Sequence, residues 1–157
     1  MATKSDTPVP EGANTLTLYL SFKRQCSEAI ELYRNAFDAR SLMPPMTTGD
    51  GRIIHSMIRI GDSNIMMSDL FDESNYSVGN MTSVWMYVSD CDAVFNKAVS
   101  EGFEVIMPLE DQFWGDRMGM VKDPFGYMWS IATNKWKMSE DEIKQREKEW
   151  FKSMGLE

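Results

Sequence analysis

The chain has 157 residues, of which 43% are hydrophobic and 25% are charged, a composition typical of globular proteins rather than of disordered or fibrous ones. Its formal net charge of −8 argues against a nucleic-acid partner, because phosphate binding depends on clustered Lys and Arg. No apolar run approaches the roughly 20 residues of a membrane span, and the N-terminus lacks an apolar signal core. We therefore expect a cytoplasmic protein with neither nucleic acid nor membrane as a partner.

A first module of strand, helix and three strands is predicted over residues 15–70, after a polar and flexible lead-in at residues 1–14. Alternating apolar residues indicate the strands, and an apolar face with helical spacing indicates the helix. Gly and Asp residues mark the turns between strands. The predicted elements span residues 15–22, 26–37, 41–45, 52–60 and 64–69.

The same order recurs about 64 or 65 residues later, which is the signature of an internal repeat. A polar linker is predicted over residues 71–82 and a second module over residues 83–135. The elements of the second module are predicted at residues 83–89, 90–102, 104–108, 116–122 and 127–133.

A last helix is predicted over residues 138–154, opened by a capping box of Ser139 and Glu142. One helix and four strands cannot bury both faces of their sheet alone, so the two modules are expected to share a core. The predicted class is therefore α+β, with two tandem βαβββ modules that form a curved eight-stranded sheet around a cleft, plus the C-terminal helix.

Four stretches carry a resemblance to a known family: "YLSF...EAIELYRNAFDA" (19–39), "HSMIRIGDSNIMMSD" (55–69), "YVSDCDAVFNKAVSEG" (87–102) and "MPLEDQFWGDRMGMVKDPFGYMWSIAT" (107–133). In this order they resemble the PhnB-like branch of the vicinal oxygen chelate superfamily. That superfamily includes glyoxalase I, extradiol dioxygenases, fosfomycin resistance enzymes and bleomycin resistance proteins. The resemblance covers nearly all of residues 15–135 and implies a homodimer.

The superfamily implies a divalent metal, held by His and Glu side chains from the first and last strands of each module. The corresponding places in this chain are Thr15 or Leu16, Met66, Ser83 and Ser130. None of these is a useful ligand for such a metal, and the chain has one His in all. A metal site is therefore disfavoured, no cofactor is predicted, and Asp69 is the one nearby group that a slip in register would recover.

Aromatic residues dominate the strand that begins the second module. Trp85 and Tyr87 share a face with Ser83 and are expected to line the cleft, whereas Trp129 alternates to the other face and should pack beneath a helix. In an acidic protein, such rings suit a flat, cationic ligand through stacking and cation–π attraction. The alternative is that the rings fill the cleft as an ordinary core.

The loop over residues 110–117 concentrates Phe113 and Trp114 beside a Gly. Large aromatic side chains there suit a lid over an apolar ligand. The alternative is a buried anchor, with Asp116 and Arg117 paired to hold the loop. His55 is either a general base or a histidine hydrogen-bonded at the rim of a core.

Cys26 and Cys91 match neither a disulfide framework nor a zinc motif. Each begins a predicted helix, where the helix dipole can lower a thiol pKa, but no base is near in sequence. Both are therefore predicted to be free and unreactive.

Three hypotheses remain at the level of sequence. The first is a metal-independent small-molecule-binding protein, comparable to the bleomycin resistance proteins, with an aromatic or cationic ligand. The alternative is a glyoxalase- or dioxygenase-like enzyme, a lyase or isomerase, with an atypical metal site, and a third is an interaction module that uses the last helix. Relatives labelled as methyltransferases give no support for that activity, because the chain lacks a Gly-rich nucleotide turn. The predicted ligand-binding residues are His55, Met66, Asp69, Trp85, Tyr87, Phe113, Trp114, Arg117 and Ser130, and the candidate catalytic residues are His55, Asp69 and Asp116.

Overall fold

A computed structural model describes residues 5–10, 12–74, 77, 79 and 81–156 of the chain. The predicted lead-in and the predicted linker therefore lie partly outside the described residues. The chain divides into two compact units, Met1–Tyr76 and Ser77–Glu157. Among the described residues, no helix has the length and apolar character that a membrane crossing requires.

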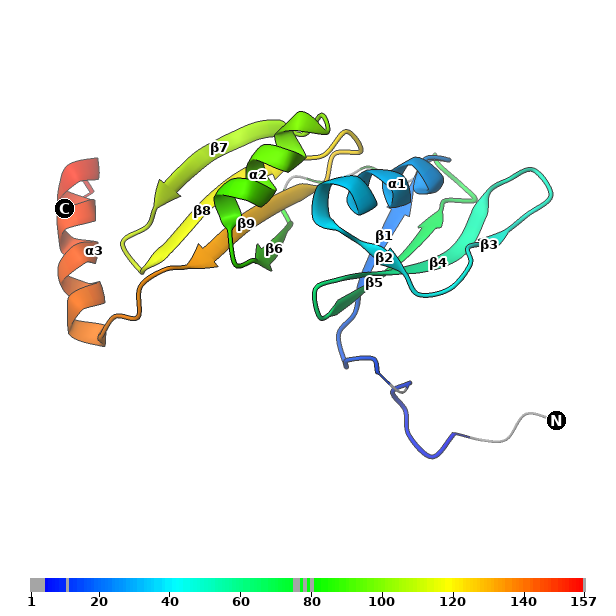
Figure 1. The fold of residues 1–157 in the computed structure, drawn as a ribbon, viewed down its shortest axis with the longest axis horizontal. Coiled ribbons are helices and arrows are strands. Elements are labelled where there is room, and N and C mark those ends of the chain that lie inside the picture. The colour runs from blue at the N-terminus through cyan, green and yellow to red at the C-terminus, as the bar shows by residue number, and fades with distance from the viewer. Residues whose placement is uncertain (1–4, 11, 75–76, 78, 80, 157) are drawn as a thin grey trace. The chain divides into compact units, whose positions relative to one another are not determined.

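The first unit contains one helix and a five-stranded sheet with strand order β1-β5-β4-β2, in which β3 also pairs with β4 (Figure 1). Strands β1 and β5 run parallel, and the other pairs are antiparallel. The elements are β1 (Leu18–Phe22), α1 (Cys26–Phe37), β2 (Arg40–Ser41), β3 (Met46–Thr47), β4 (Ile53–Ile60) and β5 (Ser63–Asp69).

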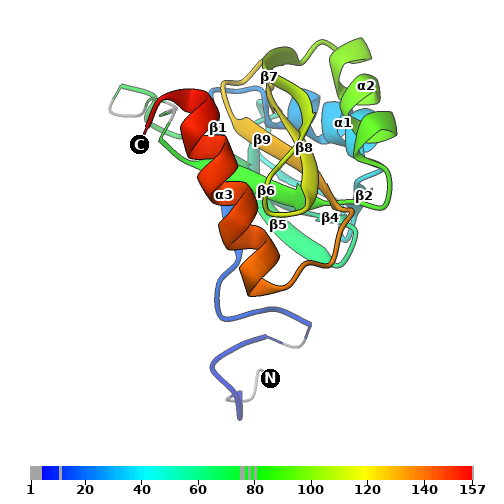
Figure 2. The same cartoon turned by 90° about the vertical axis from the view of Figure 1, so that its left-hand side faces the viewer.

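The second unit has the same strand order, β6-β9-β8-β7, again with its first and last strands parallel. Figure 2 views this unit with its C-terminal helix in the foreground. Its elements are β6 (Ser83–Tyr87), α2 (Cys91–Ser100), β7 (Glu104–Asp111), β8 (Asp116–Lys122), β9 (Met128–Asn134) and α3 (Glu140–Met154).

The predicted α+β class, the two modules and the C-terminal helix are confirmed, with two differences in detail. The described residues form nine strands rather than eight, because the two-residue strand β3 adds to the edge of β4. The strands also form two sheets, one in each unit, rather than one continuous sheet. Strands as short as β2 and β3 are too brief to show an alternating pattern in the sequence.

One face of each sheet is covered by the helix of its own unit. In the second unit, a Cβ atom at Gly119 would lie 2.6 Å from a ring carbon of Phe95 on α2, which places β8 directly against the helix. Val121, Trp129 and Ile131 share this face and are at most 1% exposed. Trp129 therefore lies on the helix-covered face, as its alternation with Ser130 predicts.

The N-terminus of each of these helices is fixed by a polar side chain of the last strand. Asp69 accepts hydrogen bonds from the backbone N–H of Cys26 (2.9 Å) and of Ile53 (2.8 Å). At the matching place in the second unit, Thr133 accepts from the backbone N–H of Cys91 at 2.9 Å. The first amides of a helix lack partners within the helix, so these side chains satisfy groups that burial would otherwise leave unpaired.

Both cysteines are buried and free. Burial, and secondly the charge of Asp69, raise the pKa of the Cys26 thiol to about 12. The Cys26 thiol therefore stays protonated at neutral pH, which agrees with the prediction that it is unreactive.

The stretch "DPFGYMW" forms a tight turn that is held by one of its own side chains. The carboxylate of Asp123 accepts hydrogen bonds from the backbone N–H of Phe125 (3.0 Å) and Tyr127 (2.9 Å), and from the indole N–H of Trp129 (3.0 Å). Gly126 has a positive φ of 97°, which few other residues adopt without strain. This motif therefore shapes the β8–β9 hairpin rather than a ligand site.

Replacing Asp69 by Ala is expected to lower the free energy of unfolding by about 2–4 kcal/mol, because two buried amides lose a charged acceptor. Urea unfolding followed by circular dichroism measures the change. The exposed Glu101→Gln variant serves as the control and should lie within about 0.5 kcal/mol of the wild type. A stable Asp69→Ala protein that fails to bind a ligand would instead favour the predicted binding role.

Candidate functional site

The second unit carries a hollow of about 650 Å³ lined by Trp85, Tyr87, Trp114 and Asp116, which we call the aromatic pocket. Trp85 and Tyr87 come from β6, Asp116 begins β8, and Trp114 lies in the loop before it. The strand register places Trp85 opposite Ser130 and Tyr87 opposite Ala132, on the face that α2 does not cover. The pocket therefore occupies the open face of this sheet.

The carboxylate of Asp116 forms the polar centre of the pocket. One of its oxygens accepts hydrogen bonds from the Tyr87 hydroxyl (2.9 Å) and the Trp114 indole N–H (3.0 Å). The other accepts from the side-chain amide of Asn134 at 2.8 Å. The side chain is 3% exposed, so these bonds replace the water that it loses on burial. One carboxylate thus joins β6, β9 and the loop before β8.

The two aromatic rings of β6 are partly exposed to solvent. Trp85 is 43% exposed and Tyr87 62%, with ring centroids 6.1 Å apart and planes tilted by 48°. The hydrogen bond from the Tyr87 hydroxyl to Asp116 raises the pKa of Tyr87, with smaller effects from burial and from the charge of Asp116. Tyr87 therefore stays a neutral hydrogen-bond donor, and its bond to Asp116 favours the observed direction of the ring.

The position of Trp114 depends on a tight turn in front of β8. Gly115 has φ of 105°, and its backbone oxygen accepts hydrogen bonds from the amides of Lys135 and Trp136, both at 3.0 Å. A Cβ atom at this place would lie 2.5 Å from the backbone oxygen of Trp136. A glycine is therefore required here, both for the backbone angle and for the space.

Helix α3 extends the aromatic cluster through Phe113. The ring of Phe113 lies 5.0 Å from Trp114 at 88°, an edge-to-face contact, and 5.5 Å from Trp150 on α3. None of the residues of α3, all of which are described, is buried. The helix thus contacts Phe113, which lies beside the pocket-lining Trp114 and does not itself line the pocket.

The predicted pairing of Asp116 with Arg117 is wrong. Arg117 points to the other face of β8, where its guanidinium forms two hydrogen bonds with Asp92 on α2, at 2.7 and 2.8 Å. It also contacts Asp111 at 3.3 Å. Adjacent residues of a strand point to opposite faces, so Asp116 and Arg117 cannot share one. Arg117 therefore anchors the helix to the sheet and lies outside the aromatic pocket.

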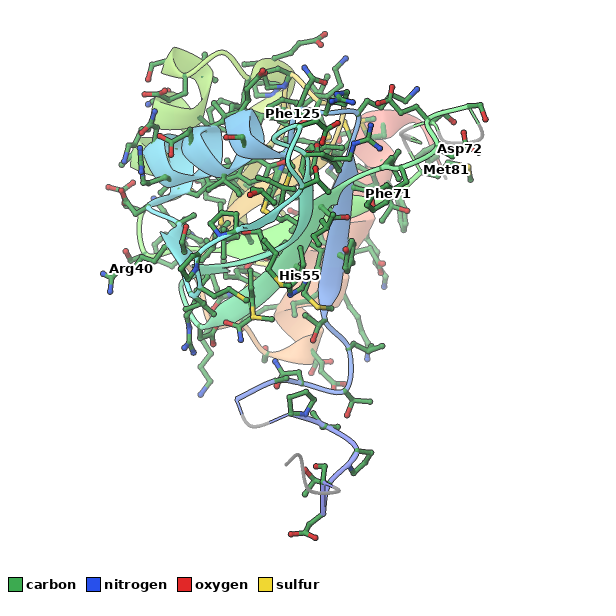
Figure 3. All side chains as sticks on the ribbon, turned by 90° about the vertical axis from the view of Figure 1, so that its right-hand side faces the viewer. Arg40, His55, Phe71, Asp72, Met81 and Phe125 are labelled. Atoms are coloured by element: carbon green, nitrogen blue, oxygen red, sulfur yellow. The ribbon has the colours of Figure 1, made fainter. Side chains whose placement is uncertain are left out.

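Three predicted site residues lie in the first unit, and the pocket-lining residues lie in the second. His55 is half-buried on β4, and Met66 lies on β5, both on the face opposite the one that packs against α1. Figure 3 labels His55 on its strand. Asp69 lies on the helix-covered face, with both carboxylate oxygens bound to backbone amides. Asp69 therefore holds the start of α1 and does not line the open face.

Ser130 and Asn134 also lie on the open face, both on β9. Ser130 is fully buried, and its hydroxyl has no hydrogen-bond partner among the described residues. Asn134, the third donor to Asp116, is a residue that sequence reasoning missed. The available signal was its spacing, because Ser130 and Asn134 are four residues apart on one strand and so share a face.

The residues present do not fit the divalent metal that the family resemblance implies. Asp69 and Thr133 hold equivalent helices, which makes Met66 equivalent to Ser130. The register between the parallel first and last strands of each unit then makes Thr17, rather than Thr15 or Leu16, equivalent to Ser83. Thioether and hydroxyl groups are poor ligands for such metals. Within the described part of the chain, no group of three or more His, Cys, Asp or Glu side chains could hold a metal ion.

Comparisons with known proteins agree with this fold. A family model for the Glyoxalase/Bleomycin resistance protein/Dioxygenase superfamily matches residues 16–131. An uncharacterized protein of Mycobacterium tuberculosis is 36% identical over 125 residues, which cover 74% of this chain and 73% of that protein.

Two solved structures show the same fold at low sequence identity. A PhnB protein from Bacillus cereus is 19% identical with a TM-score of 0.66, covering 76% of this chain and 99% of its own. The fosfomycin resistance protein FosX from Mesorhizobium loti is 15% identical with a TM-score of 0.55, covering 77% of this chain and 92% of its own.

An Asp116→Asn substitution is expected to lower the pKa of Tyr87 toward its ordinary value of about 10, because the neutral amide no longer favours the protonated phenol. NMR titration of ring-labelled tyrosines measures the change, and a Tyr87→Phe variant assigns the signal. Asp92→Asn is the control, since Asp92 contacts Arg117 on the opposite face. An unchanged titration in the Asp116→Asn protein would contradict the hydrogen bond.

Proposed function

Since the chain belongs to the Glyoxalase/Bleomycin resistance protein/Dioxygenase superfamily, we propose that it is a PhnB-like member that binds a small organic molecule without a divalent metal. The proposed binding site is the aromatic pocket of the second module. The observation that carries the proposal is the exposure of two large rings, Trp85 at 43% and Tyr87 at 62%, beside a buried carboxylate that binds the Tyr87 hydroxyl.

The shape and chemistry of the pocket suit the face of a flat molecule. Ligand sites are mostly apolar with a few placed polar groups, and this shallow site is lined by three aromatic side chains and one carboxylate. Because Asp116 fixes the Tyr87 hydroxyl and the Trp114 indole, these side chains lose little conformational freedom when a ligand binds. A preorganised site of this kind supports recognition by stacking.

Independence from metal is proposed from the donor set. Thr17, Met66, Ser83 and Ser130 stand where the family resemblance places its His and Glu ligands, and none supplies imidazole or carboxylate. Some members of the superfamily, the bleomycin resistance proteins, are expected to sequester a drug without altering it. We propose the same mode of action here, with a different ligand.

Catalysis has less support in this pocket than binding. Its two titratable side chains are Tyr87 and Asp116, and they are hydrogen-bonded to each other. A raised pKa makes Tyr87 a poor base near neutral pH, and three donors occupy the Asp116 carboxylate. Catalysis by His55, and assembly of the chain into a homodimer, stay predictions.

A Trp85→Leu substitution is expected to weaken the binding of flat aromatic molecules by about tenfold, because the leucine removes one stacking surface. Titration of quinoline and naphthalene derivatives, followed by the quenching of tryptophan fluorescence, measures the affinity. Trp136→Leu is the matched control, since Trp136 is 59% exposed and does not line the pocket. Equal losses in both variants would argue against the pocket as the site.

Dialysis against a chelator is expected to leave this affinity unchanged, because no metal takes part in the proposed binding. Mass spectrometry of the protein before and after incubation with manganese, zinc, nickel and iron(II) should find less than one metal per chain. A stoichiometric metal whose removal abolishes binding would overturn metal independence and favour the enzyme hypothesis.

A further inference from the structure

We infer that the ligand of the aromatic pocket carries an alkylated ammonium group, with the buried carboxylate of Asp116 as its counter-charge. This inference rests on the proposed function and adds the chemical class of the ligand. It is carried by the place of Asp116: Asp69 and Asp123 are also buried carboxylates, but they hold a helix start and a hairpin, whereas Asp116 lines the aromatic pocket.

Asp116 is a buried carboxylate whose hydrogen-bond donors are all neutral. They are a phenol from Tyr87, an indole from Trp114 and a carboxamide from Asn134. Buried carboxylates are usually paired with a cation, because taking a charge out of water is costly. Among the described residues no cation contacts Asp116, and the guanidinium of Arg117 is bound to Asp92 and Asp111 instead.

The rings around this charge make the pocket suitable for a cation. The face of an aromatic ring is negative, and rings of Trp and Tyr attract ammonium groups within about 6 Å of the centroid. Here the hydroxyl of Tyr87 and the indole N–H of Trp114 both donate to Asp116. Donation to a carboxylate polarises each donor and makes its ring a better acceptor of positive charge. A net charge of −8 attracts cations from a longer range.

The accessibility of Asp116 favours an alkylated ammonium over a primary amine. A carboxylate offers about four lone-pair positions, and three are already used. The side chain is 3% exposed, so a ligand meets the rings of Trp85 and Tyr87 before it meets the oxygens. An ammonium with methyl groups needs no hydrogen bonds, packs against ring faces, and feels the carboxylate through space.

The test compares benzyltrimethylammonium with neopentylbenzene, in which carbon replaces the charged nitrogen at the same shape. Calorimetry on the full chain is expected to show that the cation binds at least tenfold more tightly than the neutral molecule. Asp116→Asn should remove most of this preference, because it lowers the affinity for the cation at least tenfold more than the affinity for neopentylbenzene. Asp92→Asn is the control with the same change of charge on the opposite face, and it should keep the preference.

A second variant covers the case in which Asp116→Asn fails to fold. Trp85 has no hydrogen bond to Asp116 and is 43% exposed, so Trp85→Leu should fold and should also reduce the preference for the cation. Equal binding of both molecules to the wild type would overturn the inference and leave the proposed function in place. Failure of both molecules to bind at millimolar concentration would overturn both.

Discussion

Each module has one helix for a sheet with two faces, and the rest of the structure follows from this constraint. The helix-covered face takes the apolar strand residues, such as Ile131 and Trp129, and excludes water from them. The other face has no cover within its own module, so its side chains must either remain exposed or satisfy one another. In the second module Tyr87, Trp114 and Asn134 satisfy Asp116, while the rings of Trp85 and Tyr87 stay partly exposed and line the pocket.

The hydrogen bonds of Asp116 serve the fold and the site together. They connect the first strand, the last strand and the loop before β8 through side chains, in addition to the backbone pairing of the sheet. The same bonds set the directions of Tyr87 and Trp114. In the proposed binding mode, the same carboxylate also supplies the negative charge that faces the ammonium group of the ligand.

Much of the fold, and part of the site, could be predicted from the sequence. The order of the elements follows from the alternation of apolar residues, and the same alternation places Trp85 and Tyr87 opposite to Trp129. Applied to Asp116 and Arg117, it would also have excluded their pairing. Two of the three partners of Asp116 lie 29 residues before it and 18 residues after it, and no pattern near Asp116 identifies such contacts. The role of Asp69 was likewise hidden, because a helix cap supplied by a distant strand leaves no mark near the helix.

The symmetry of the two modules ends in their cores. The strand register makes Ser56 of β4 the counterpart of Gly119 of β8, and the Ser56 hydroxyl is buried without a partner among the described residues. At Gly119, a side chain would meet Phe95 as well as the backbone of β7, whose atoms come within 3.1 Å of a Cβ there. Strand β4 could not replace strand β8 unless the helix or β7 moved. A second module in which β4 replaced β8 would therefore need a new interface between helix and sheet, even though the order of its strands would be unchanged.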